Sequence, residues 1–361
     1  MGLGRARGVP GIKVFVIMET GERARGALYG LAIGDALGMS TQMLSRRQIT
    51  ERWGAQLHGF EPAPPGHPIA VGLPAGSVTD DTEQAVLLGR LLVAGQGTVD
   101  PQELATALVD WERDMAARGS LDLLGPSTKR AVAAILAGTP AQDAGASGNT
   151  NGAAMRIAPV GIVADLPDLP DQPDLADLTA LVDRVVAASF ITHNTGLALA
   201  GAAAVAAAVS AGISGASTTE ATTIATAAAR LAADRGHWVA GADVAARIQW
   251  AATLVAGRDE AQAAELIYTL VGTSLAAQES VPAAFAVLAA VPDDPWQACL
   301  LAASLGGDCD TIAAMAGAVA GACHGVSAFP VDAIAVIDAQ GLDLATLADD
   351  LYALRTGRQP R

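Results

Sequence analysis

The chain has 361 residues, of which 51% are hydrophobic, 16% are charged and 4% are aromatic. This apolar content is enough for a large buried core and excludes an intrinsically disordered protein. A net charge of −15, without a cluster of basic residues, argues against binding to the phosphate backbone of a nucleic acid. Because alanine supplies much of the apolar content and aromatic residues are few, we expect an all-α fold of closely packed helices.

Residues 1–20 begin basic and contain a short apolar run. The run is too short for a secretion signal with a cleavage site, so we expect a disordered extension before a domain that starts at residue 21. The cysteines, Cys299, Cys309 and Cys323, show no CxxC spacing, which favours neither a disulfide framework nor a zinc ribbon. These features predict reduced thiols in a cytoplasmic protein.

From Glu22, apolar residues at helical spacing predict a helix that ends in a turn at Gly34-Asp35-Ala36-Leu37-Gly38, where glycines permit close approach of another element. Repeated prolines and glycines over residues 60–76 exclude a regular helix and predict an extended loop. Apolar spacing then predicts helices over residues 81–94, 101–117 and 127–137. Residues 165–183 repeat Asp, Leu and Pro and predict a solvated loop leading into a helix.

After residue 180 we expect nearly continuous helix, over residues 181–190, 196–211, 219–233, 240–256, 261–275, 281–290, 296–305 and 311–326. The uncharged stretch 195–219 is long enough to cross a membrane, but its small residues favour a buried helix, and no transmembrane span is predicted. Gly317 and Gly321 indicate that the helix over 311–326 is crowded and central. We expect a catalytic domain over 21–330 and, over 331–361, a C-terminal helical segment packed on the domain or trailing it.

Two acidic sequences, Thr79-Asp80-Asp81-Thr82 and Asp308-Cys309-Asp310-Thr311, follow glycines and precede apolar helices. Helix capping is enough to explain either acidic sequence taken alone, because acidic side chains at a helix start accept hydrogen bonds from backbone N–H groups. A cap needs one side chain, however, whereas each sequence carries paired carboxylates that require a counter-ion. If the fold joins the two sequences, their carboxylates and threonines form an all-oxygen set suited to Mg²⁺ or Mn²⁺. A metal pair there would leave positions open for water and substrate.

Two polar loops lie between the acidic sequences. The segment Gly148-Asn-Thr-Asn-Gly-Ala-Ala-Met-Arg156 predicts a turn capped by Asn151 or, alternatively, a phosphate cradle of backbone N–H groups, with Arg156 adding charge or bracing the loop. In Thr192-His193-Asn194-Thr195, one of the last two residues is expected to cap the following helix. His193 is then either a structural histidine or a contact to a substrate hydroxyl or phosphate.

These motifs in this order resemble the ADP-ribosylglycohydrolase family, and the resemblance extends over residues 23–325. An ordered set of motifs is far more specific than any one of them. It implies a compact, single-domain, all-α fold with two Mg²⁺ or Mn²⁺ ions at the floor of a cleft. The matching segments are Gly26-Ala-Leu-Tyr-Gly-Leu-Ala-Ile-Gly-Asp-Ala-Leu-Gly38, Gly76-Ser-Val-Thr-Asp-Asp-Thr82, Asn151-Gly-Ala-Ala-Met-Arg156, Ile191-Thr-His-Asn194 and Leu305-Gly-Gly-Asp-Cys-Asp-Thr-Ile-Ala313.

Carried onto this chain residue by residue, the resemblance implies a set of metal ligands in which Asp310 is the bridge. The ligands are Thr79, Asp80, Asp81, Asp308, Asp310 and Thr311. The resemblance also places Asn151, Gly152 and His193 at the diphosphate and distal ribose of ADP-ribose, and the candidate substrate-binding residues further include Thr150 and Arg156. Asp122 resembles an acid that some bacterial members use near the scissile bond.

Gln42 marks a departure from the family pattern. Members usually carry a glutamate a few residues after the Gly-Asp-Ala-Leu-Gly turn, where this chain has Ser40-Thr41-Gln42. A glutamine cannot accept a proton as a carboxylate does. If Gln42 fills that place, a metal-activated water aligned by Asp80, Asp81 or Asp122 is the natural substitute. The candidate catalytic residues are therefore Asp80, Asp81, Asp310, Asp122 and Gln42.

The expected activity is metal-dependent hydrolysis of the ribosyl C1 glycosidic bond in ADP-ribosylated protein side chains or small molecules, with release of ADP-ribose. Gln42 leaves open an alternative on the same fold, the hydrolysis of nucleosides or other ribosylated metabolites. A further alternative is a non-catalytic relative that binds metals and ADP-ribose. The expected partner is an ADP-ribosylated protein or a small molecule resembling ADP-ribose, and neither a nucleic acid nor a membrane.

Overall fold

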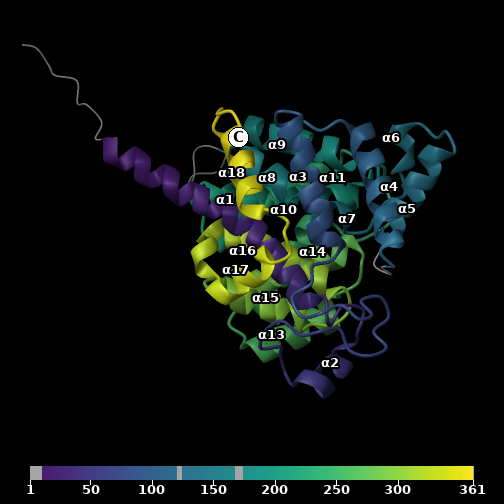
Figure 1. The fold of residues 1–361 in the computed structure, drawn as a ribbon, viewed down its shortest axis with the longest axis vertical. Coiled ribbons are helices and arrows are strands. Elements are labelled where there is room, and N and C mark those ends of the chain that lie inside the picture. The colour runs from purple at the N-terminus through teal and green to yellow at the C-terminus, as the bar shows by residue number, and fades with distance from the viewer. Residues whose placement is uncertain (1–9, 120–123, 167–173, 361) are drawn as a thin grey trace, which may run out of the picture.

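The computed structural model describes residues 10–119, 124–166 and 174–360, and within these ranges the chain folds into helices and loops without a β-strand. The all-α prediction is confirmed (Figure 1). The elements are α1 (Pro10–Gly38), α2 (Arg46–Trp53), α3 (Asp80–Ala94), α4 (Pro101–Ala117), α5 (Pro126–Leu136), α6 (Ala141–Ala144), α7 (Gly152–Met155), α8 (Ala158–Val163), α9 (Leu175–Ser189), α10 (Gly196–Ile213), α11 (Thr218–Ala233), α12 (Val244–Val255), α13 (Glu260–Leu266), the π-helical turn η1 (Ile267–Val271), α14 (Ala277–Ala290), α15 (Pro295–Ala303), α16 (Cys309–His324), the 3₁₀ turn η2 (Val326–Ala328), α17 (Val331–Asp338) and α18 (Leu344–Arg355).

The contact between α1 and α16 forms the centre of the molecule. Every residue of α16 before His324 is buried, as expected for a crowded central helix. Glycines face each other across this contact, since a Cβ atom on Gly26 or Gly30 would overlap the backbone of Gly321 or Gly317. The two backbones therefore touch directly. This close approach brings the end of α1 to the start of α16.

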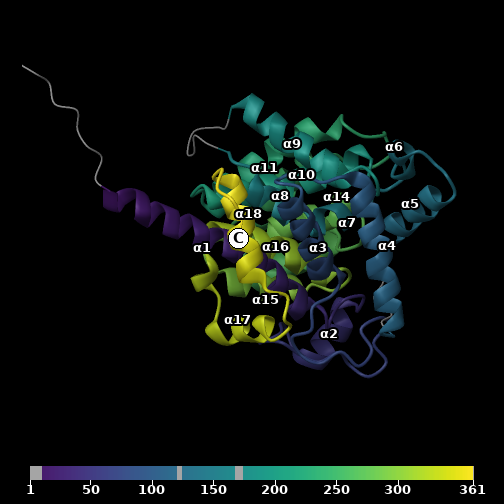
Figure 2. The ribbon, with the colours of Figure 1, turned by 45° about the horizontal axis from the view of Figure 1, so that its top comes forward.

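α1 is longer than the sequence predicted at both ends. It begins at Pro10, inside the expected extension, and its first turns project from the body of the molecule (Figure 1, Figure 2). At its other end it continues to Gly38 instead of turning at Gly34, because both glycines lie against the backbone of α16 and preserve the close helix contact. The chain turns immediately afterwards, over residues 39–43.

α10 is apolar and long enough to cross a membrane, yet 94% of this stretch is buried inside the protein. All its residues after Gly196 are buried. Its alanines allow close packing against α11, α16 and α8. The burial is that of a core helix.

The proline-rich segment over residues 60–76 contains no helix, as predicted. The buried His67 supports it, because its Nδ1 accepts hydrogen bonds from the backbone N–H groups of Ile69 (3.3 Å) and Ala70 (2.9 Å). The segment leads to Thr79, which caps α3. The predicted loop over 165–183 is shorter than expected, because α9 already begins at Leu175; residues 167–173 lie outside the described residues.

The last helices, α17 and α18, dock on α1. Tyr29 donates a hydrogen bond to Asp338 (2.5 Å), and Arg25 pairs with Asp349 (2.8 Å). The opposite side of the molecule carries α4, α5 and α6 (Figure 2). The C-terminal segment is therefore packed on the helical body.

Candidate active site

Asp35, near the end of α1, organises the first acidic sequence. It accepts hydrogen bonds from the backbone N–H groups of Thr79 (2.9 Å) and Thr82 (3.1 Å) and from both of their hydroxyl groups. Burial raises the pKa of Asp35 to about 6, and these hydrogen bonds oppose the rise. The sequence analysis gave this residue no role, although it lies in one of the matching segments.

The fold brings the two acidic sequences together. Thr311, at the start of α16, donates a hydrogen bond from Oγ1 to Oδ2 of Asp81 at the start of α3 (3.2 Å). Asp80, Asp308 and Asp310 line one cavity, which has a volume of about 180 Å³ and which we call the carboxylate cavity. The Asp308 side chain makes no capping hydrogen bond to α16, so helix capping does not account for its carboxylate.

The carboxylates of this cluster lie close enough to one another to raise each other's pKa. The pKa of Asp81 is raised well above its ordinary value by burial and then by the negative charges of Asp310, Asp80, Asp35 and Asp308. Burial raises the pKa of Asp308 to about 6, and a hydrogen bond from Asn151 opposes the rise. A cation in the cavity would remove the repulsion that makes these ionised groups costly.

The donor chemistry of the cluster fits the predicted ions. Carboxylate and hydroxyl oxygens are the ligands that Mg²⁺ and Mn²⁺ prefer, and the buried Oδ1 of Asp81 has no hydrogen-bond partner among the described residues. In the described ranges, no three acidic, histidine or cysteine side chains converge into a ready-made metal site. Asp80 and Asp308 instead accept hydrogen bonds from Gln84 (3.0 Å) and Asn151 (2.5 Å). The metal ligands therefore stay a prediction.

Asn151 and Gly152 line the carboxylate cavity, as does Thr150. Asn151 stands at the N-cap position of α7, as one alternative predicted, but its side chain makes no capping hydrogen bond. Its Nδ2 donates to Asp308 and to Ser280 (3.0 Å), and its backbone N–H donates to Leu275 (2.9 Å). These bonds hold the loop against the second acidic sequence.

His193 lies behind this loop, and the carboxylate cavity is not among the spaces that it lines. Its ring is completely buried between the hydroxyl groups of Thr150 (Nε2, 2.9 Å) and Thr192 (Nδ1, 2.8 Å), and Gly152 leaves room for it. Burial lowers the pKa of His193 well below its ordinary value, with the nearby arginines adding to the effect. His193 is therefore a neutral ring that supports Thr150. Thr195 caps α10, as expected of one of the two residues after His193.

Arg156 is fully buried and braces the loop, which is one of the two predicted alternatives. It donates to Gln84 (3.0 Å) and to Thr192 (2.7 Å), and Gln84 in turn donates to Asp80 (3.0 Å). Burial lowers the pKa of Arg156 to about 10. Gln84 was missed by the sequence analysis, because a glutamine inside a helix carries no local signal of this relay.

Gln42 lies in the turn after α1, is 3% exposed and lines the carboxylate cavity. Backbone hydrogen bonds from Met43 to Gly307 (2.7 Å) and from Gly307 to Leu44 (2.8 Å) attach this turn to the glycines before Asp308. Nε2 of Gln42 is buried and has no partner among the described residues. A residue that lines the cavity thus carries a buried amide donor for which the described residues offer no acceptor.

The start of α5 forms a further wall of the carboxylate cavity through Gly125, Pro126 and Thr128. Gly125 offers no side chain to cap α5, so the first N–H groups of the helix are not satisfied by a cap. The sequence analysis did not assign these residues to the site. Asp122, which it did assign, lies outside the described residues.

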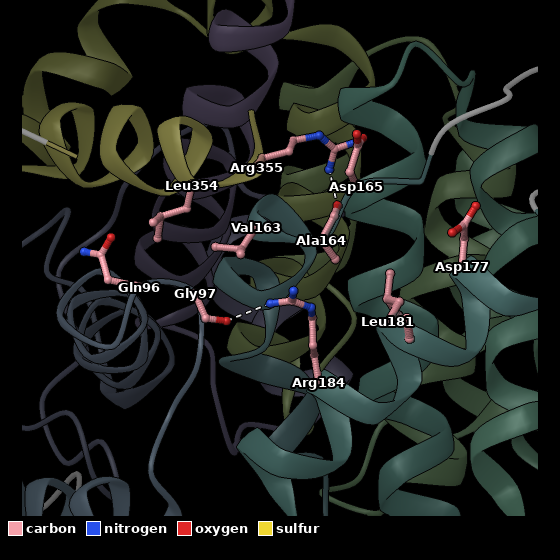
Figure 3. A pocket seen from close by; sticks show the side chains of 11 residues that line it. Gln96, Gly97, Val163, Ala164, Asp165, Asp177, Leu181, Arg184, Leu354 and Arg355 are labelled. Atoms are coloured by element: carbon pink, nitrogen blue, oxygen red, sulfur yellow. Dashed lines mark hydrogen bonds and ion pairs between the residues drawn. The ribbon is translucent and has the colours of Figure 1, made fainter. Parts of the chain in front are cut away.

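A separate hollow of about 260 Å³ lies beside α8, α9 and α18 (Figure 3). Arg184 donates to the backbone oxygen of Gly97 (2.7 Å), and Arg355 pairs with Asp165 (2.9 Å). Its basic groups are therefore bound within the protein. Among the described residues it shares no wall with the carboxylate cavity, which remains the candidate active site.

Comparisons with known proteins identify the family and the fold of the chain. The family model for ADP-ribosylglycohydrolase matches residues 18–361. The protein YegU of Escherichia coli (strain K12), which is uncharacterized, is 36% identical over 340 residues, or 94% of this chain and 98% of its own length. The ADP-ribosylarginine hydrolase Tri1 of Pseudomonas putida (strain GB-1) is 34% identical over 151 residues, or 39% of this chain and 36% of its own length. A solved structure of an ADP-ribosylglycohydrolase-related protein complex superposes with a TM-score of 0.66 at 26% identity, over 94% of this chain and 99% of that one.

Proposed function

This chain belongs to the ADP-ribosylglycohydrolase family and is a hydrolase of the glycosidase type, and on that premise we propose that it cleaves the ribosyl C1 bond of ADP-ribosylated protein side chains or small molecules in a metal-dependent reaction. The observation that carries the proposal is the meeting of Asp80, Asp308 and Asp310 in one cavity. The two acidic sequences that supply these residues lie far apart in the chain, and helix capping does not account for the carboxylate of Asp308.

Hydrolysis forms a bond from water to C1 of the ribose and breaks the bond from C1 to the acceptor atom, so positive charge develops on the ribose ring. Asp80 and Asp310 stabilise this charge from the cavity wall, where a low dielectric strengthens the interaction. Asp80 also orients the attacking water. Its carboxylate is held by the relay from Arg156 through Gln84, so it is already positioned before substrate binds.

The proposed ligands of two Mg²⁺ or Mn²⁺ ions are Thr79, Asp80, Asp81, Asp308, Asp310 and Thr311. When bound, the ions would supply counter-charge and polarise ribose hydroxyls and water. Thr79 donates its hydroxyl proton to Asp35 (2.8 Å), which leaves lone pairs of Thr79 Oγ1 for a cation. Asp35 therefore orients a proposed ligand and is not itself one.

We assign the ADP-ribose moiety to the walls made by Asn151, Gly152 and the start of α5, where the uncapped backbone N–H groups of α5 face phosphate oxygens in the proposed complex. Thr150 completes this wall. His193 and Arg156 act behind it, through Thr150 and Gln84, and are positioning residues.

The test is release of ADP-ribose from ADP-ribosylated arginine or serine by purified protein with Mg²⁺ or Mn²⁺. Chelation, Asp80→Ala and Asp310→Ala should each abolish release, whereas Asp332→Ala, on the exposed face of α17, should retain it. Activity that survives chelation would contradict the mechanism. Hydrolysis of free nucleosides without any conjugate would move the function to the nucleoside alternative, and binding of metal and ADP-ribose without turnover would indicate a non-catalytic relative.

A further inference from the structure

A second hollow, which we call the side hollow, adjoins the carboxylate cavity. Ile69 lines both spaces, and α3 contributes Asp80 to the cavity and Glu83 to the side hollow. Residues three apart on a helix are neighbours on one face. The side hollow has a volume of about 540 Å³, against about 180 Å³ for the cavity. A group attached to C1 of a ribose bound beside Asp80 would therefore lie next to the side hollow, which is the larger of the two spaces.

The walls of the side hollow are largely apolar. Val71 and Leu73 come from the proline-rich segment, Val78 follows it, and Met115 comes from α4. The Val71 side chain is 58% exposed, which is unusual for a large apolar residue beside a charged active site. A concave apolar wall with an exposed valine is suited to covering by an apolar side chain of a bound molecule.

Glu83 supplies an unused acceptor in this space. Trp111 (Nε1, 2.5 Å) and Arg118 (Nη2, 3.3 Å) both donate to its Oε2. Both of these bonds go to Oε2, and in the proposed complex Oε1 accepts from an N–H group of a bound molecule. Arg118 is exposed and already paired with Glu83, and the described lining of the side hollow contains no other cation for a diphosphate.

These features assign the ADP-ribose moiety of a substrate to the carboxylate cavity and the group attached to C1 to the side hollow. The start of α5 and the loop at Asn151 line the carboxylate cavity, whereas the side hollow offers largely apolar walls, and its described lining contains one cation, Arg118, which is paired with Glu83. A single modified side chain would not fill about 540 Å³. We propose that the side hollow binds the polypeptide segment that flanks an ADP-ribosylated residue, with an apolar side chain on Val71 and an N–H group on Glu83. The inference rests on the proposed function and narrows its substrates to proteins and peptides.

The experiment compares two substrates, free ADP-ribosylarginine and a peptide in which leucine stands beside ADP-ribosylarginine. Val71→Asp places a charge on the apolar wall without disturbing the core, and Val331→Asp is the matched control, because Val331 is 80% exposed on α17. We expect Val71→Asp to lower kcat/KM for the peptide about tenfold. The value for free ADP-ribosylarginine should stay within about twofold, and Val331→Asp should leave both values unchanged.

Equal losses on both substrates, or no loss on the peptide, would overturn the inference. Calorimetry with ADP-ribose supplies an independent reading: weaker binding to Val71→Asp would assign the side hollow to the adenosine half of the ligand and overturn it as well. If the unmodified protein cleaves neither substrate, the proposed function fails on its own. Calorimetry with the same peptide then tests the inference separately, which requires that Val71→Asp weaken peptide binding more than ADP-ribose binding.

Discussion

Gln42 lines the carboxylate cavity together with Asp80 and Asp310, and its side-chain amide is buried. Its Nε2 has no described partner, and such a buried group costs about 1–3 kcal/mol. A substrate oxygen that accepts from Nε2 would offset this cost. We predict that Gln42→Leu lowers kcat/KM about tenfold while the melting temperature stays equal or rises. Thermal unfolding and steady-state kinetics on the same samples measure both effects.

The control for Gln42 is the isosteric change to glutamate, which keeps the shape and replaces the donor by an acceptor. Because it adds a negative charge beside Asp80 and Asp310, Gln42→Glu should lower the stability of the metal-free protein. A clear fall in melting temperature for Gln42→Leu would instead mean that the amide has a structural partner.

At the residue scale, the sequence predicted which side chains gather but not which of them face the cavity. Asn151 and Gly152 line it, whereas His193 and Arg156 support the wall from behind. A motif gives residue type and spacing only, so residues that face the cavity and residues that support its wall match the motif equally well. Asp35 shows the reverse, because its hydrogen bonds run to threonines on another helix and no local pattern could reveal them.

At the element scale, the glycines of α1 position the site. A Cβ atom on Gly34 would overlap the backbone of Ala313 in α16, and the neighbouring Asp35 holds the start of α3. We predict that Gly34→Ala destabilises the protein by about 2–4 kcal/mol and reduces activity, because the helices must separate. Gly21→Ala is the control, since nothing lies within 4 Å of the added Cβ atom. It should be neutral or stabilising by up to about 1 kcal/mol.

Chemical denaturation measures this difference directly. Equal effects of the two substitutions would show that the contact between α1 and α16 is looser than described. The same contact explains why the sequence misplaced the end of α1: a glycine read in isolation predicts a turn, whereas here it removes the side chain that would keep two helices apart. The partner helix α16 lies far away in the sequence, so local spacing could not distinguish a glycine in a turn from a glycine in a close helix contact.

At the scale of the whole molecule, composition and motif order were sufficient for the fold class and the family. An alanine-rich chain with few aromatic residues packs helices closely, and α10 and α16 do so with almost no exposed side chain. The relative placement of α3 and α16, which joins the acidic sequences, depended instead on the resemblance. No sequence motif indicated the side hollow, because its walls are mainly ordinary apolar residues from α4 and the proline-rich segment.

The repulsion stored in the carboxylate cluster predicts two effects of opposite sign for Asp81→Asn. Burial and neighbouring charges raise the pKa of Asp81 in the folded protein, so its ionised form costs free energy at neutral pH. Without metal, Asp81→Asn should therefore raise the free energy of unfolding, by about 1–2 kcal/mol. With Mn²⁺ at 100 times its Kd, the unmodified protein should gain about 2.7 kcal/mol, and the variant should lose most of that gain. Asp332→Asn, on the exposed start of α17, should show neither effect. A variant that is less stable without metal and still stabilised by Mn²⁺ would mean that Asp81 is held by partners inside the protein, and that the cation binds elsewhere.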